Sequence, residues 1–86
     1  MLSDQSLIRI RLSGETLVFR LTQTFNLFLK TVCFQFEPAD EKQSVRQKLV
    51  LIYDAAEHIF RPEDEILKTN TALRHCLEKY VKELQV

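Results

Sequence analysis

The chain has 86 residues, and 12 Lys and Arg balance 12 Asp and Glu, so its formal net charge is zero. This length predicts one small interaction domain, 1–86, and the absence of a basic surplus argues against direct nucleic-acid binding. The single Gly excludes a glycine-rich phosphate loop, and the longest apolar run, Leu49–Tyr53, is too short to span a membrane, so we expect no membrane partner.

Two segments near the start alternate apolar and polar residues. Leu7–Leu12 and Thr16–Leu21 each have the period of two that is typical of a half-buried strand. Ser13-Gly14-Glu15 between them supplies a turn, because Gly enters positive φ without steric cost. The sequence therefore predicts a β-hairpin.

An apolar stripe at helical spacing comes next. Its members recur every three or four residues: Phe25, Phe28, Leu29, Val32, Cys33 and Phe36. This spacing predicts an amphipathic helix that ends near Glu37-Pro38, because the residue before a proline avoids the α region.

The polar segment Glu37–Gln47 is expected to be a loop. The apolar run Leu49–Asp54 after it predicts a central strand that is buried on both faces. Helical spacing of apolar residues also fits one helix over Ser44–Phe60. We favour the strand because Val, Leu, Ile and Tyr are packed together there.

The last third of the chain predicts a helix over Ala72–Gln85. Pro62 followed by acidic residues resembles a helix start, and Asn70 could instead cap a separate final helix. Whether the helical region begins at Pro62 or after Asn70 is open at this point.

The order of these elements, over about residues 7–65, resembles the β-grasp fold of ubiquitin-like proteins and, within them, the SUMO-like branch. The segments Leu29–Cys33 and Leu51–Asp54 stand where the family has its helix motif and a strand that ends in an aromatic residue and Asp. Ile59 and the acidic segment Arg61–Glu65 resemble the short fourth strand and the turn after it. The predicted final helix departs from the family, which ends in a strand.

The resemblance implies an α+β, β-grasp-like fold, ββα and then a central strand, with an added C-terminal helix. The alternative fold is an N-terminal β-hairpin packed on three helices. Conjugated family members end in Gly-Gly and this chain ends in Leu84-Gln85-Val86, so the implied function is an adaptor-like docking domain that is not itself conjugated.

In SUMO-like domains a groove between the second strand and the first helix accepts a peptide as an added strand. The resemblance places six residues in that groove: Val18, Phe19, Arg20, Leu27, Lys30 and Phe34. The alternative interpretation is that these side chains complete the domain core.

The final helix carries a second candidate surface. Its stripe is formed by Leu73, Leu77, Tyr80 and Leu84. The stripe either packs on the domain's own sheet or pairs with another helix, so that the chain would be a structural subunit of a homodimer or a larger complex.

Candidate catalytic side chains are few. His58 and His75 are the only histidines; His75 is adjacent to Cys76, but neighbouring residues of a helix do not face each other, so the pair does not predict a catalytic site. Cys33 and Cys76 lie on apolar helical faces and are expected to be reduced core thiols of an intracellular protein, in the nucleus or the cytoplasm. We therefore expect no enzymatic activity, no cofactor and no metal site, and a partner that is another protein.

Overall fold

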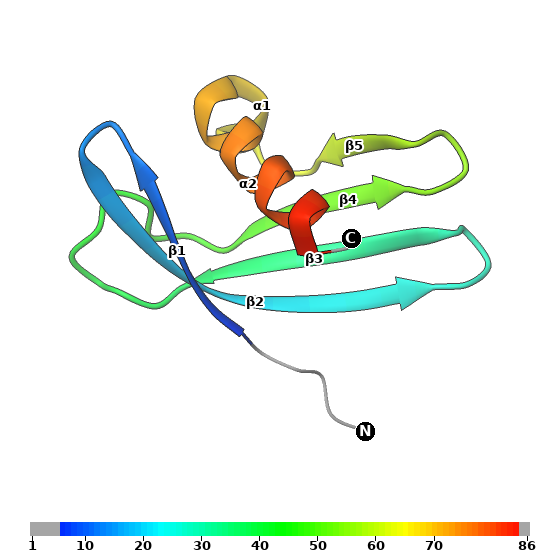
Figure 1. Cartoon of the computed structure of the whole chain (residues 1–86), viewed down its shortest axis with the longest axis horizontal. Helices are drawn as coiled ribbons and strands as arrows, with labels where there is room; N and C mark the ends of the chain where they lie inside the picture. The colour runs from blue at the N-terminus through cyan, green and yellow to red at the C-terminus, as the bar shows by residue number, and fades with distance from the viewer. Residues whose placement is uncertain (1–5, 85–86) are drawn as a thin grey trace.

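The structure is a computed structural model that describes residues 6–84. Five strands precede two helices and form one antiparallel sheet in the order β1-β2-β3-β4-β5 (Figure 1). The elements are β1 (Ser6–Leu12), β2 (Glu15–Asn26), β3 (Thr31–Pro38), β4 (Leu49–Asp54), β5 (Ile59–Pro62), α1 (Glu65–Thr69) and α2 (Thr71–Leu84). The predicted α+β class is confirmed.

The predicted first hairpin is also confirmed. Leu12 pairs with Glu15, which leaves a two-residue loop. Ser13 and Gly14 both have positive φ, 52° and 78°, as a type I′ turn requires. The second strand is longer than predicted, because β2 continues to Asn26.

The helix predicted over the stripe from Phe25 to Phe36 is wrong. Phe25 ends β2, Phe28 and Leu29 lie in a turn, and the remaining members of the stripe belong to β3. In β3 the apolar residues also alternate, and Val32, Phe34 and Phe36 all face the core. Because β3 is hydrogen-bonded to β2 on one side and to β4 on the other, strand pairing satisfies its backbone and buries these side chains together.

The predicted strand Leu49–Asp54 is confirmed as β4, and the rival helix over Ser44–Phe60 is wrong. The strand is buried on one face only: Leu49 and Leu51 are in the core, whereas Val50 and Ile52 are half-buried on the opposite face.

The C-terminal region forms two helices. Pro62 ends β5 instead of starting a helix, and the final helix starts after Asn70, whose side-chain oxygen accepts a hydrogen bond from Leu73 N at 3.1 Å. The predicted cap is therefore present, and the short α1 is a separate element.

Both helices contribute to a core on one face of the sheet, which we call the inner face. Phe19 and Phe36 meet edge to face at 6.1 Å in this core, and α2 packs against β1. The core is made of Ile8, Ile10, Leu17, Phe19, Leu21, Val32, Phe34, Phe36, Leu49, Leu51, Leu67, Leu73, Leu77 and Val81. Within the described residues no helix covers the opposite, outer face.

Gln43 is the buried polar residue that fastens the long β3–β4 loop to the sheet. Its Oε1 accepts a hydrogen bond from Val18 N at 2.8 Å, and its Nε2 donates to Val45 O at 2.8 Å. Ser44 beside it donates through both N and Oγ to the Glu15 carboxylate, each at 2.7 Å. The loop thereby supplies hydrogen-bond partners to the part of β2 before Phe19, which is not paired with β3.

We expect Gln43→Leu to lower the free energy of unfolding by about 1–3 kcal/mol, because it leaves Val18 N–H and Val45 C=O without their partner. Urea denaturation followed by circular dichroism measures this. Gln47→Leu, at an exposed position of the same loop, is the matched control and should stay within about 0.5 kcal/mol of wild type. Equal effects of the two substitutions would show that Gln43 has no special role.

Leu77 tests the packing of α2. The side chain is fully buried, so Leu77→Ala should cost about 2–5 kcal/mol, and Leu77→Glu should unfold the protein because an unpaired charge would be buried. A Leu77→Glu protein that is folded and monomeric, by circular dichroism and light scattering, would show instead that Leu77 belongs to an interface.

Candidate functional site

The six predicted groove residues do not line one groove. Phe19 and Phe34 are fully buried core residues, so for these two the core interpretation is correct. Val18 and Arg20 lie on the outer face of β2. Leu27 and Lys30 lie in the turn between β2 and β3. The groove as predicted is wrong, because the helix that was to form its other wall is a turn and a strand.

The stripe on the final helix is divided in the same way. Leu73 and Leu77 are fully buried against the sheet, and Tyr80 is partly buried beside the core. The side chain of Leu84 lies outside the described residues. The stripe is therefore core where it is described, and Leu73 and Leu77 are not accessible to a second helix in this fold.

Exposed apolar side chains gather instead at one end of the sheet. The exposed fraction is 98% for Phe28 and 78% for Leu27. We call this cluster the apolar tip; it consists of Phe25, Leu27, Phe28, Leu29 and Ile59. These are five of the six large exposed hydrophobic residues found in residues 6–83; the sixth, Leu7, is on β1.

The sheet register brings the two turns of the apolar tip together. Asn26 pairs with Thr31, Thr31 with Asp54, and Asp54 with Ile59, so the β2–β3 and β4–β5 turns leave the same end of the sheet. Both lie at the right-hand end of Figure 1, away from the β1–β2 turn. A hydrogen bond from Ala55 N to Lys30 O, at 2.9 Å, joins them.

The two turns have the same internal design. Asn26 Oδ1 accepts a hydrogen bond from Leu29 N at 3.0 Å, and Asp54 Oδ1 accepts from the backbone N–H groups of Ala56 and Glu57. Such Asx contacts replace backbone pairing in a tight turn. Each turn ends in a residue with positive φ: Lys30 at 53° and His58 at 58°. The apolar side chains are therefore held on a defined backbone.

Polar groups of both signs surround the apolar tip. Asp54 forms an ion pair with Arg61 at 3.2 Å. The backbone N–H of Glu57, with the Arg61 side chain, keeps the pKa of Asp54 below its ordinary value, against the smaller opposing effect of burial. His58 Nδ1 lies 3.2 Å from the Tyr53 hydroxyl, and the Tyr53 and Phe60 rings contact each other with centroids 5.0 Å apart and planes tilted by 50°.

The two histidines lie in different elements of the described part of the chain. His58 pairs with a tyrosine, and His75 is an exposed residue of α2. Both cysteines are free and half-buried, and Cys33 is on the outer face of β3 instead of on the predicted helix. Across residues 6–84 no three His, Cys, Asp or Glu side chains are grouped so that they could hold a metal ion.

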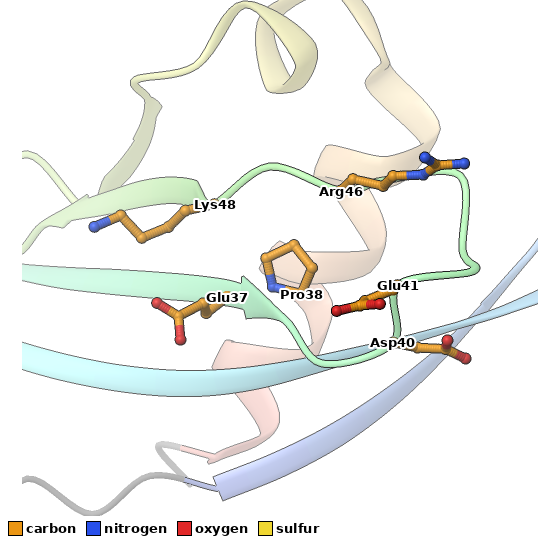
Figure 2. Close-up of a pocket in the computed structure, with 6 residues that line it drawn as sticks. All are labelled: Glu37, Pro38, Asp40, Glu41, Arg46 and Lys48. Carbon is orange, nitrogen blue, oxygen red and sulfur yellow. The ribbon is translucent and has the colours of Figure 1, made fainter.

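A hollow lies beside the β3–β4 loop. It has a volume of about 590 Å³, and Figure 2 shows Lys48 and Arg46 pointing away from each other and Asp40 pointing outward from the loop. The hollow is lined by Glu37, Pro38, Asp40, Glu41, Arg46 and Lys48. The charged groups that line the hollow thus do not converge on one point.

The sequence contained a signal for the apolar tip. The alternation of Val32, Phe34 and Phe36 with polar residues is a strand pattern, and Asn26 before Leu27–Leu29 is a turn residue. The helical spacing of the same apolar residues concealed this pattern.

Comparison with known proteins identifies no relative. No protein-family model matches the chain, and neither the curated proteins nor the solved structures contain a match. In the part of the chain that the structure describes, neither helix has the length and apolar character needed to cross a membrane.

The lowered pKa of Asp54 predicts acid sensitivity. A carboxylate whose pKa is lower in the folded than in the unfolded state contributes stability above its unfolded pKa, and this contribution is lost as the pH falls below about 4. The pKa of Glu15 is lowered too, by its hydrogen bonds from Ser44. Asp54→Asn and Glu15→Gln should each make the loss of stability between pH 6 and pH 3 shallower.

Urea midpoints measured across that pH range test this. The double variant should show a shallower profile than either single variant, because the two carboxylates lie at opposite ends of the sheet and do not share partners. Wild-type profiles in all three variants would show that neither carboxylate is protected by folding.

Proposed function

We propose that the protein is a non-enzymatic protein-interaction module that docks through the apolar tip. The observation that carries this proposal is the concentration of exposed large hydrophobic side chains at one end of the sheet. Apolar surface removed from water contributes about 25 cal/mol per Å², and an exposed apolar cluster of this kind is typical of a binding surface.

The surroundings of the apolar tip favour a protein partner. Protein interfaces have an apolar centre with few charges and a polar rim. The centre here is Leu27–Leu29, and the rim contains Lys30, Glu57 and the Asp54–Arg61 ion pair. A surface that docks on an anionic bilayer would instead be expected to have a basic rim.

The proposal keeps the role that the resemblance to ubiquitin-like modules implied, which is docking without conjugation inside the nucleus or the cytoplasm. It moves the binding surface from the predicted groove to the turns. A β-grasp relationship is not needed for it, because the argument depends only on the exposed side chains and their rim.

Phe28→Ser is the first test. Phe28 is almost completely exposed, so the substitution should change the free energy of unfolding by less than about 0.5 kcal/mol and yet weaken partner binding at least about tenfold, as expected for an aromatic anchor. The full chain is expressed with a tag in cells, proteins bound to it are crosslinked and purified, and their recovery is quantified by mass spectrometry.

Leu7→Ser is the matched control, because Leu7 is exposed (53%) but lies outside the apolar tip. It should retain the proteins that Phe28→Ser loses. Two results would contradict the proposal: equal recovery with Phe28→Ser, or sedimentation of the wild-type chain with protein-free phosphatidylcholine and phosphatidylserine vesicles that Phe28→Ser abolishes. The second result would identify the apolar tip as a lipid-binding surface.

A further inference from the structure

β1 is an edge strand with an unoccupied side. It pairs with β2 over Ser6–Leu12, and no other strand among residues 6–84 pairs with it. The backbone hydrogen bonds outside the strand pairs and helices do not involve β1 in this part of the chain. An edge of this kind can accept a further strand through its free N–H and C=O groups.

The free edge lies beside α2, and a shallow groove separates them. The groove has a volume of about 200 Å³. It is lined by Arg9 and Ile10 from β1 and by Cys76, Lys79, Tyr80 and Glu83 from α2. Ile10 is a core residue, and Cys76 and Tyr80 pack against the core, so the groove has an apolar floor. A strand edge with a helix beside it is a recurrent arrangement for binding extended peptides.

The charge beside the groove is mainly positive. Arg9 and Arg11 face the same side of β1, and Arg20 of β2 is diagonal to Arg9 because it pairs with Leu7. The ion pairs found in residues 6–84 involve other residues, Arg61 with Asp54 and Arg74 with Glu78. The three arginines thus have no carboxylate within 4 Å in this part of the chain, and in the groove itself Lys79 and Glu83 contribute one charge of each sign.

We propose that the groove between β1 and α2 binds an extended segment of another protein in which acidic and apolar residues alternate, as a strand added to the edge of β1. Side chains of a strand alternate between its two faces. One set would pack on the apolar floor that Tyr80 and Cys76 provide, and the other would pair with Arg9 and Arg11. This site is separate from the apolar tip, which lies at the end of the sheet formed by the β2–β3 and β4–β5 turns.

The probe is the synthetic peptide acetyl-Glu-Val-Glu-Val-Glu-Val-Glu-amide, titrated into the ¹⁵N-labelled full chain at low salt. We expect saturable shifts of the backbone amides in Ser6–Leu12 and in the groove side of α2. A peptide with Lys in place of Glu should bind at least about tenfold more weakly because like charges meet. A Glu/Val peptide with alternate N-methylated amides should also lose binding, because strand addition needs those N–H groups.

Arg9→Glu and Arg11→Glu should each weaken binding of the acidic peptide about tenfold or more, with the remaining amide spectrum unchanged. Arg46→Glu, an exposed arginine of the β3–β4 loop, is the matched control and should bind like wild type. Phe28→Ser should also bind like wild type, so this test is independent of the apolar tip.

Three results would overturn the proposal. They are shifts confined to residues 25–30, equal affinity for the acidic and the lysine peptide, or no saturation at millimolar peptide.

Discussion

The offset between the two partners of β2 determines which parts of this strand lack a neighbouring strand on one side. β2 pairs with β1 over Glu15–Leu21 and with β3 over Phe19–Asn26. Only three residues of β2, Phe19–Leu21, have a partner strand on both sides within the described chain. The β2–β3 hairpin therefore extends beyond the described part of β1, and the start of β2 extends beyond β3.

Different hydrogen bonds form at the two ends of β2 that lack a neighbouring strand on one side. At the start of β2, Gln43 and Ser44 of the β3–β4 loop bond to Val18 and Glu15 and replace a neighbouring strand. At the other end, side chains of Asn26 and Asp54 bond the turns internally, so their apolar residues stay in solvent. Buried backbone groups must be paired. Exposed apolar side chains are tolerated in solvent, and burying them against a partner is favourable. The first end contributes to stability, and the second carries the proposed binding surface.

The helices cover only the inner face of the sheet, so the core and the candidate binding surfaces lie in different parts of the molecule. α2 buries the inner face through Leu73, Leu77 and Val81, and this leaves its flank beside β1 as the wall of a groove. The outer face keeps Arg9, Arg11 and Arg20 next to one another. The apolar tip and the groove of β1 and α2 thus differ in chemistry, because one is an apolar protrusion with a mixed rim and the other is a groove with an apolar floor at a strand edge, next to the arginines of the outer face.

Local patterns in the sequence were sufficient to predict the elements for which a nearby turn, a cap or the residue composition favours one conformation. The first hairpin follows from period-two alternation around Ser13-Gly14, β4 from its apolar run of Leu, Val, Ile and Tyr, and α2 from its stripe and the Asn70 cap. Segment 25–36 could not be resolved in this way, because its apolar residues fit both a helix and a strand.

Only the tertiary structure decided that segment. β3 is a strand because β2 and β4 supply hydrogen bonds on both of its sides while Phe34 and Phe36 join the core to which α2 contributes. The candidate binding surfaces could not be predicted from the sequence for the same reason. Exposure of Phe28 and the free edge of β1 depend on where distant strands end, and a side chain's burial is a property of the packed fold and not of its neighbours in sequence.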